Sequence, residues 1–292
     1  MSGYVLITAA HDEEAFIART CESVLSQTLP PLRWIVVDDA STDGTAAIVE
    51  RFREAHPERI ELLRLQRPPG RDFRNKVRAF DAGLARAREL AFSHVGNLDA
   101  DIELRPDYYA RMLAHFRNDP GLGIAGGMVH SCIAGAYVAQ NVAPDSVAGA
   151  VQLFRRECFD AIGGYLPLRQ GGVDAAAEIM ARQKGWRVRT FGDVPVLEHR
   201  RTGTATADPL SARRREGARL RSLGYRWSFF VARCIRRSLE KPPVIGSLVA
   251  LYGYLASAAR RDPVVLPDDA IAYLRDEQRT KLLRLVGFRR RA

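Results

Sequence analysis

The chain has 292 residues, enough for one large α/β domain with an appendage or for two modest domains. Its 47% hydrophobic and 27% charged residues exclude wholesale disorder, and its four cysteines and six histidines show neither CxxC nor HExxH spacing, which argues against a disulfide framework and a zinc enzyme. The net charge of +10 is uneven, because residues 1–199 carry 23 Lys and Arg against 26 Asp and Glu, whereas residues 200–292 carry 21 against 8. An acidic globular domain followed by a basic attachment region is the organisation that this charge predicts.

Short apolar runs alternate with helical patterns over the first hundred residues. The expected strands cover residues 4–9, 34–37, 60–65 and 92–98. The expected helices cover residues 16–25, 46–55 and 77–91. This alternation predicts βαβ units and a mostly parallel sheet of the α/β class, in which ligands bind beyond the carboxyl ends of the strands.

Carboxylates follow three of these expected strands. They are Asp12, Glu13 and Glu14 after the first, Asp38, Asp39 and Asp43 after the second, and Asp99 and Asp101 after the fourth. Like charges gathered at one edge repel, so a cation, a donor-rich ligand or raised pKa values must offset their proximity. The alternative is that each cluster only caps the following helix, which is favoured for Asp43 alone but not for the three clusters together.

Four stretches, in this order, resemble the family-2 nucleotide-sugar glycosyltransferases of the GT-A fold. They are residues 5–14, 34–45, 96–101 and, more weakly, 163–186. The resemblance covers about residues 4–203 and implies a GT-A (Rossmann-like) α/β fold, a mostly parallel mixed sheet flanked by helices. We expect a catalytic domain over residues 1–205 and a basic amphipathic helical region over residues 206–292.

A divalent cation site is implied by Asp99 and Asp101. Two carboxylates two residues apart in a short turn can face one Mg²⁺ or Mn²⁺ together with substrate phosphates. By the resemblance, Asp101 ligates the metal and Asp99 lies near the ribose or a metal-bound water. A metal there would neutralise the diphosphate leaving group.

The nucleoside pocket is implied by three further positions. Asp39 resembles the aspartate that recognises the base, and Ala9 and Glu13 match positions that line the pocket. His11 and Asp12 stand where the family more often has Tyr and Asn, which leaves the nucleoside open. A UDP-sugar is favoured as donor, with a GDP-sugar second.

Basic side chains are expected on the diphosphate. Arg71 and Lys76 precede a helix, and Lys76 matches a recurrent lysine of the family; a solvated basic loop is the alternative. His199 follows an apolar strand and is expected to contact the metal or the diphosphate, with a purely structural role as the alternative.

The general base is expected on the helical segment near residue 174. An inverting transfer needs a carboxylate that takes the proton of the acceptor hydroxyl. Asp174 falls on the aspartate of the family's ED motif, although Val173 replaces the usual Glu and Ala176 replaces a second acid. Glu178, one helical turn later, is the second candidate, and the loss of the flanking acids keeps open that neither residue is the base.

The C-terminal region predicts membrane attachment. Apolar and aromatic residues recur at steps of three and four over residues 220–239 among many arginines, which is typical of a helix lying in a membrane interface. Residues 244–259 form an uncharged run of 16, short of the about 20 that a spanning helix needs, and predict a buried, re-entrant or interfacial helix. The alternative is that these helices pack on the catalytic domain or on a second subunit.

The expected function is metal-dependent inverting transfer of a sugar to a lipid-linked or saccharide acceptor in surface polysaccharide or glycolipid synthesis. We expect no targeting peptide and a cytoplasmic protein, peripheral on the inner face of the cell membrane. Nucleic acid is not an expected partner, because the aromatics among the basic residues fall on the apolar stripe. A non-catalytic scaffold and a nucleotidyltransferase on a similar fold are the alternative functions.

Overall fold

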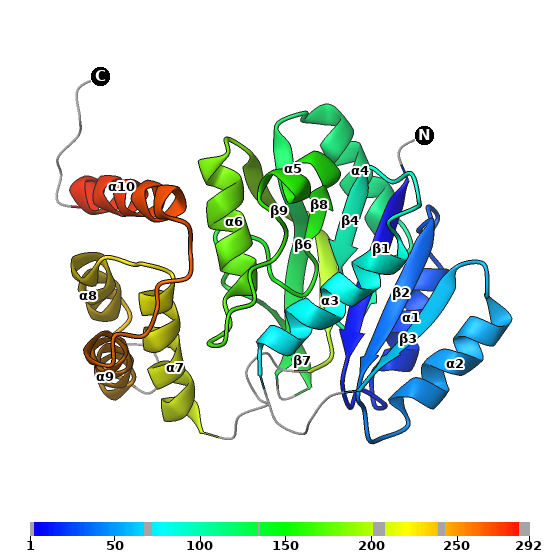
Figure 1. Ribbon diagram of the computed structural model, residues 1–292, viewed down its shortest axis with the longest axis horizontal. Coiled ribbons are helices and arrows are strands. Elements are labelled where there is room, and N and C mark those ends of the chain that lie inside the picture. The colour runs from blue at the N-terminus through cyan, green and yellow to red at the C-terminus, as the bar shows by residue number, and fades with distance from the viewer. Residues whose placement is uncertain (1–2, 67–71, 134, 201–207, 239–242, 286–292) are drawn as a thin grey trace. The chain divides into compact units, whose positions relative to one another are not determined.

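The computed structural model describes residues 3–66, 72–133, 135–200, 208–238 and 243–285 (Figure 1). The chain divides into a first unit, residues 1–169 with 173–202, and a second unit, residues 170–172 with 203–292. That residues 1–205 form a catalytic domain and residues 206–292 a membrane-associating region stays a prediction.

A nine-stranded mixed sheet is the centre of the first unit, with the order β3-β2-β1-β4-β8-β6-β9-β5 and β7 paired to β6. The strands are β1 Tyr4–Ala10, β2 Arg33–Asp39, β3 Ile60–Leu65, β4 His94–Asn97, β5 Ile102–Leu104, β6 Leu122–Ile133, β7 Ala136–Ala139, β8 Leu153–Arg155 and β9 Arg187–Glu198. The pairs β1–β2, β2–β3, β1–β4 and β6–β9 are parallel, and the others are antiparallel. The predicted α/β class, with parallel strands from the first hundred residues, is therefore confirmed.

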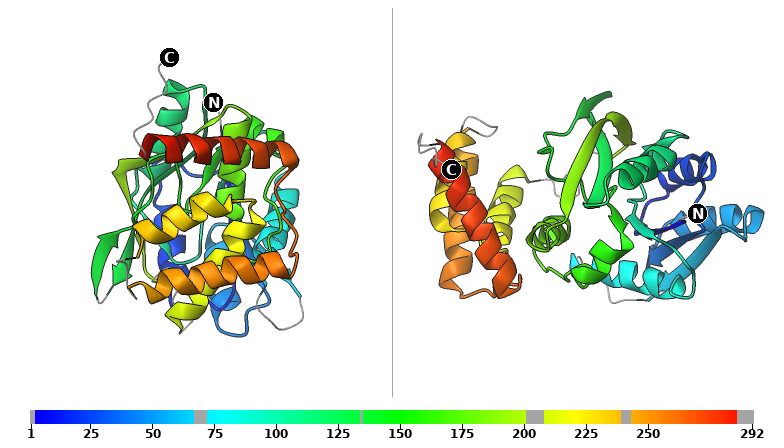
Figure 2. Two further views of the ribbon diagram at one scale, coloured as in Figure 1. Left: turned by 90° about the vertical axis from the view of Figure 1, so that its left-hand side faces the viewer. Right: turned by 90° about the horizontal axis from the view of Figure 1, so that it is seen from above.

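Helices cover both faces of this sheet (Figures 1 and 2). They are α1 Ile17–Leu25, α2 Thr45–Ala55, α3 Arg74–Arg86, α4 Tyr108–Asn118, α5 Arg156–Ala161 and α6 Val173–Gln183. On one face, Gly83 lets α3 approach so closely that a Cβ there would lie 2.8 Å from Ile7 and 3.0 Å from Val37. On the other face, the ring of Tyr4 stacks on Tyr109 of α4 at 4.5 Å. Strands β1 and β2 are thus buried on both sides, which is why their sequences are almost continuously apolar.

The second unit consists of α7 Pro209–Ser222, α8 Trp227–Arg236, α9 Ile245–Ala259 and α10 Asp268–Leu285. The expected single helix over residues 220–239 is wrong, because the chain turns between α7 and α8. Gly224 has φ +78°, and the N–H groups of Gly224 and Tyr225 donate to Arg221 and Leu220, which is the glycine-dependent motif that ends a helix.

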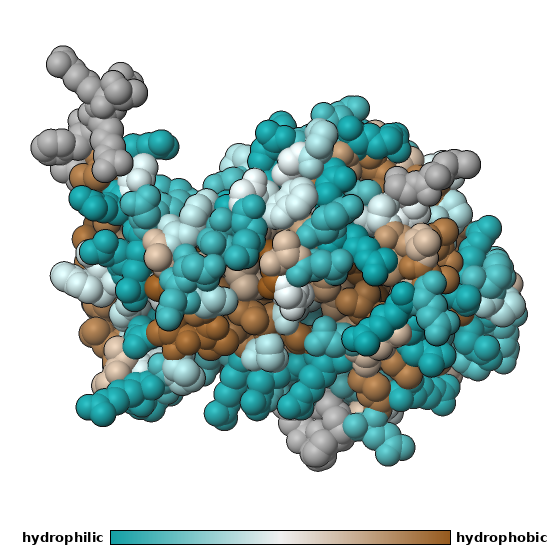
Figure 3. All heavy atoms as spheres, turned by 45° about the horizontal axis from the view of Figure 1, so that its top comes forward, coloured by the Kyte–Doolittle hydropathy of each residue, from teal (hydrophilic) through white to brown (hydrophobic). Residues whose placement is uncertain are grey.

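Helix α9 confirms that the uncharged run is helical, and it packs against α7 and α8. Phe230 of α8 stacks on Tyr254 of α9, with ring centroids 4.8 Å apart. Apolar residues also reach the surface of this unit among hydrophilic ones (Figure 3). Among the described residues, no helix combines the length and apolar character needed to cross a bilayer.

Candidate active site

The carboxyl ends of β1, β2 and β4 lie at one edge of the sheet, because these strands are adjacent and parallel. The loops after β1 and β2 are joined: the Glu13 N–H donates to Thr45 Oγ1 at 2.7 Å, and the Gly44 N–H donates to Glu14 Oε2 at 2.7 Å. Asp12 and Ala40, in these loops, have φ of +54° and +59°. Strained backbone of this kind clusters at functional sites, which agrees with a ligand site at this edge.

The turn that carries Asp99 is fixed by a loop far along the chain. The Asp99 N–H donates to the carbonyl of Ala150 at 2.9 Å. Asn97 Nδ2 donates to the Gly149 carbonyl at 2.5 Å and to Asp99 Oδ1 at 3.3 Å. Lys76 Nζ from α3 donates to the same Asp99 oxygen at 2.6 Å. The first carboxylate of the pair is therefore held in place from two sides.

Asp101 and Glu13 lie in an acidic environment. Burial, and then the charges of Asp99 and Glu198, raise the pKa of Asp101 to about 7. Burial raises the pKa of Glu13 to about 7, because its ion pair with Arg200 only partly offsets that burial and the charges of Asp101 and Asp99. The structure thus brings together Glu13, Asp99 and Asp101, as the sequence predicted.

Lys76 lies near three acidic side chains, those of Asp99, Asp101 and Asp174. Burial opposes its charged form, but Asp99, Asp174 and Asp101 outweigh that effect and raise the pKa of Lys76 above its usual value. Asp174 is in the first turn of α6, and a Cβ on Gly149 would lie 3.1 Å from its carboxylate, so a larger residue at position 149 would press against Asp174. The candidate base thus lies within the electrostatic reach of the same lysine that binds Asp99.

Glu178 has a different surrounding. Its side chain is 4% exposed, and it accepts hydrogen bonds from the Val147 N–H at 2.7 Å, Ser146 Oγ at 2.8 Å and Gln152 Nε2 at 3.3 Å. Burial, opposed by those hydrogen bonds, raises its pKa to about 7. Glu178 therefore holds the loop that carries Gly149, and its carboxylate is enclosed by protein.

Both ring nitrogens of His199 have protein partners. Nε2 lies 2.8 Å from Glu103 Oε2, and Nδ1 lies 2.8 Å from the hydroxyl of Tyr137. The His199 N–H donates to the carbonyl of Asp101 at 3.0 Å. The residue thus joins the end of β9 to the turn of Asp101, and the expected contact with a metal would require Tyr137 to move away from Nδ1.

The remaining predicted residues are Asp39, Ala9 and Arg71. Asp39 ends β2 and is 8% exposed, and Ala9 is near the end of β1 and half-buried. Arg71 lies outside the described residues. The structure adds Asn97 and Glu198. Asn97 lies in the stretch 96–101 that carries the family resemblance, where only the two aspartates were selected, and Glu198 lies in no such stretch.

The donor atoms at this edge fit a hard divalent cation. In the described part of the chain, no three His, Cys, Asp or Glu side chains are grouped as a metal cage. Asp99 and Asp101 offer carboxylate oxygens only, the ligands that Mg²⁺ and Mn²⁺ prefer, and such ions commonly complete their shell with substrate phosphates and water.

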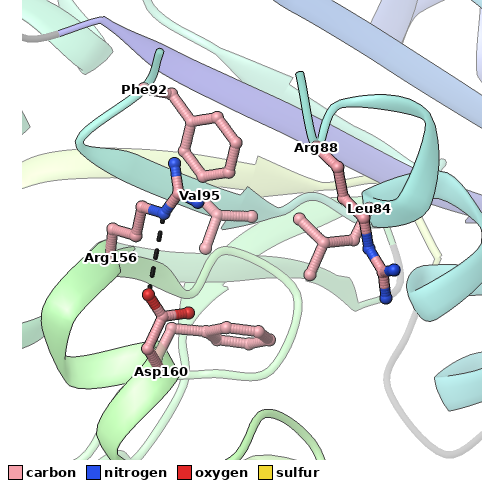
Figure 4. Close-up of a pocket in the computed structure, with 7 residues that line it drawn as sticks. Leu84, Arg88, Phe92, Val95, Arg156 and Asp160 are labelled. Atoms are coloured by element: carbon pink, nitrogen blue, oxygen red, sulfur yellow. Dashed lines mark ion pairs between the residues drawn. The ribbon is translucent and has the colours of Figure 1, made fainter. Parts of the chain in front are cut away.

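A separate hollow of about 390 Å³ lies where β4 begins, at the opposite end of that strand from Asp99 (Figure 4). It is lined by Leu84, Arg88, Phe92, Val95, Arg156, Phe159 and Asp160. Arg156 stacks over Phe92 at 4.4 Å and its Nε lies 3.6 Å from Asp160. Because parallel α/β sheets bind ligands at the other strand ends, we do not include this hollow in the active site.

A mixed sheet with helices on both faces and carboxylates gathered beyond its parallel strands is the GT-A architecture of glycosyltransferases. The model of glycosyl transferase family 2 matches residues 5–175, and the chain belongs to this family. The resemblance inferred from the sequence is confirmed.

Individual relatives are more distant. Poly-beta-1,6-N-acetyl-D-glucosamine synthase of Staphylococcus epidermidis is 28% identical over 127 residues, which are 44% of this chain and 28% of the relative. Beta-monoglucosyldiacylglycerol synthase of Synechocystis sp. is 28% identical over 191 residues, 64% of this chain and 38% of the relative. The chain thus matches well under half the length of these relatives.

Solved structures share the fold over nearly the whole chain. Mannosyltransferase PcManGT from Pyrobaculum calidifontis, in complex with GDP-Man and Mn²⁺, has a TM-score of 0.58 at 21% identity and covers 98% of this chain and 81% of its own. S. aureus TarS 1-349, in complex with UDP-GlcNAc, has a TM-score of 0.57 at 17% identity, and the match covers 99% of this chain and 93% of the TarS chain.

Proposed function

We propose that the chain transfers a sugar from a nucleotide-sugar donor to an acceptor hydroxyl, with a bound Mg²⁺ or Mn²⁺ and inversion at the anomeric carbon. The proposal rests on one observation, the convergence of Glu13, Asp99 and Asp101 with Lys76 and Asp174 at the carboxyl edge of the sheet. A UDP-sugar is the favoured donor and a GDP-sugar the second. Both nucleotides occur among the related folds, in TarS with UDP-GlcNAc and PcManGT with GDP-Man.

The donor would bind across the ends of β1, β2 and β4. Asp39 would accept a hydrogen bond from the base, while Ala9 and Glu13 line the nucleoside pocket. Lys76 and Arg71 would bind the diphosphate, and Lys76 would exchange part of its contact with Asp99 for phosphate oxygens.

Asp101 and Asp99 would hold the cation, with His199 as the remaining candidate ligand. When bound, the cation neutralises the charge that develops on the departing diphosphate. Asp174 acts as general base: its carboxylate takes the proton of the acceptor hydroxyl while that oxygen bonds to the anomeric carbon and the sugar–phosphate bond breaks. Glu178 is the second candidate for this role, but its enclosed carboxylate favours Asp174.

The acceptor would be a lipid-linked or saccharide hydroxyl delivered at a membrane. We propose that residues 206–292 attach the protein to the cytoplasmic face of the cell membrane, because these residues contain most of the chain's excess of Lys and Arg. Surface polysaccharide or glycolipid synthesis is the corresponding context, in line with the names of the two relatives.

Titration calorimetry tests the donor site. UDP and GDP would be titrated with and without Mn²⁺ into the wild type, Asp101→Asn and the control Asp160→Asn, whose carboxylate lies at the hollow beside β4. We expect one nucleotide to bind in a Mn²⁺-dependent way to the wild type and control, and at least about tenfold more weakly to Asp101→Asn. Binding of neither nucleotide would contradict the proposal.

Asp174→Asn separates catalysis from a scaffold function. We expect donor binding within about twofold of the wild type and a loss of turnover of about 10²-fold or more, measured as nucleotide release with acceptor. Full activity of Asp174→Asn would remove Asp174 as the base. Donor binding by the wild type without any turnover would favour the scaffold.

A further inference from the structure

Helix α9 of the second unit exposes a row of large apolar side chains. Ile245, Leu248, Tyr252 and Leu255 are 55–61% exposed and are spaced by three, four and three residues. At 3.6 residues per turn this spacing places all four on one face of the helix. We call these four residues the α9 stripe.

The opposite face of α9 is already used for packing. Its buried residues are Gly246, Ala250, Gly253, Tyr254 and Ser257. Ser247 Oγ also donates to the Cys234 carbonyl of α8 at 2.9 Å. Because α9 is apolar on both sides but packed on one only, the α9 stripe is an apolar surface that the described residues of the second unit do not cover.

The charge around the α9 stripe indicates what could cover it. Residues 208–261 contain 12 Lys and Arg against three Asp and Glu. Arg214 lies 6.0 Å from the ring centroid of Tyr252, and Arg260 and Arg261 follow the end of the helix. A second copy of the chain would bring two strongly basic regions together, which like-charge repulsion opposes, whereas an anionic bilayer attracts them.

We propose that the α9 stripe enters the interface of an anionic membrane, with Arg214, Arg260 and Arg261 at the level of the lipid headgroups. Helix α9 has 15 residues, about 22 Å at 1.5 Å per residue, and lies in the interface instead of spanning the bilayer. Tyr252 suits this depth, because its ring is apolar and its hydroxyl is polar. The inference rests on the peripheral attachment proposed above and identifies the surface responsible.

Co-sedimentation with vesicles tests the surface, using the full chain. Vesicles of phosphatidylcholine alone would be compared with vesicles rich in phosphatidylglycerol. We expect binding to the anionic vesicles only, and a decrease of about tenfold or more in the partition coefficient of Leu248→Asp/Leu255→Asp. The control is Leu32→Asp, which introduces a charge at a 46% exposed leucine of the first unit and should bind as the wild type does.

A second variant tests the proposal in case Leu248→Asp/Leu255→Asp does not fold. Tyr252→Trp keeps an aromatic ring in the α9 stripe. Its emission, after subtraction of the wild type with its three own tryptophans, should shift to shorter wavelength when anionic vesicles are added. The proposal is overturned if Tyr252→Trp shows no shift, if Leu248→Asp/Leu255→Asp binds vesicles normally, or if sedimentation velocity shows a dimer that this double substitution dissociates. Nucleotide titrations without vesicles are independent of these outcomes, so a failure here is distinguishable from a failure of the donor site.

Discussion

Burial is the largest effect that raises the pKa values of the half-buried Asp101 and the buried Glu178 to about 7, but their neighbouring groups differ. At Asp101, the carboxylates of Asp99 and Glu198 add to the effect of burial, so a positive charge placed among them would favour ionisation. At Glu178, burial and the charge of Asp174 raise the pKa, whereas the Val147 N–H, the charge of Arg182 and the hydrogen bond from Ser146 lower it. The first carboxyl should therefore respond to a ligand, and the second should affect folding stability.

Mn²⁺-dependent nucleotide binding should strengthen as the pH rises through 7. A proton on Asp101 competes with the cation. Below the pKa of Asp101, the affinity for the cation and nucleotide should therefore fall by up to about tenfold for each pH unit. Calorimetry between pH 6 and 8, in buffers of different ionisation enthalpy, measures both the affinity and the protons released. Equal affinity at pH 6 and pH 8, with no proton release, would contradict the assignment of Asp101.

Glu178→Gln should remove part of the pH dependence of stability. Burial raises the pKa of Glu178 in the folded protein to about 7, above its ordinary value of 4.5, so the folded state holds the proton more strongly. Its contribution is present below the unfolded pKa and is lost as the pH rises through 7, on the order of 3 kcal/mol by pH 8. Glutamine cannot ionise, so the variant should lose less unfolding free energy than the wild type between pH 5 and 8.

Urea unfolding at several pH values measures this difference. The matched control is Glu157→Gln, which makes the same substitution at an exposed residue of α5. If Glu178→Gln and the wild type change in parallel from pH 5 to 8, Glu178 is not protonated in the folded protein.

At the scale of elements, the sequence predicted those strands and site residues that depend on a single short segment of the chain. Strands β1, β2 and β3 were found from apolar runs, and Asp99 and Asp101 from their position after the next strand. Glu198 could not be predicted, because it reaches Asp101 only through the antiparallel pairing of β9 with β5, where it lies opposite Ile102. Such a pairing joins segments almost a hundred residues apart and has no signature in either segment.

At the turn between α7 and α8, a local pattern predicted a helix that the structure does not continue. Apolar residues recur at helical spacing on both sides of Gly224, so periodicity alone predicted one helix. Gly224 has a positive φ, which ends α7 and lets α8 begin in a new direction. Gly224 was the sequence signal for the end of a helix, but the prediction followed the longer periodic pattern instead.

Gly253→Ala should destabilise the second unit. A Cβ at this position would lie 2.1 Å from the Arg214 carbonyl oxygen of α7, and backbone cannot move aside as a side chain can. We expect a loss of about 1–3 kcal/mol of unfolding free energy, even though alanine favours helix formation. The control Leu255→Ala changes an exposed residue of the same helix and should stay within about 0.5 kcal/mol of the wild type in urea unfolding. Equal stability of both variants would contradict the close crossing of α7 and α9.

At the scale of the whole molecule, the two units differ in charge and each has an apolar core of its own. Tyr4, Leu6 and Trp34 are buried in the first unit, and Leu223, Phe230 and Leu274 in the second. The described residues named for the candidate donor site all belong to the first unit. Ligand binding and helix packing should therefore affect separate parts of the unfolding process.

Scanning calorimetry should resolve two unfolding transitions. Nucleotide with Mn²⁺ should raise the Tm of only one of them, that of the first unit. A ligand at 100 times its Kd stabilises the unit that binds it by about 2.7 kcal/mol, which corresponds to about 5–10 °C for a unit of some 200 residues. Gly253→Ala identifies the other transition, because it should lower the Tm of the second unit and leave the ligand-induced shift unchanged. A single transition that responds to both the ligand and Gly253→Ala would mean that the two units unfold cooperatively, and that substitutions in α7–α10 reach the donor site through stability.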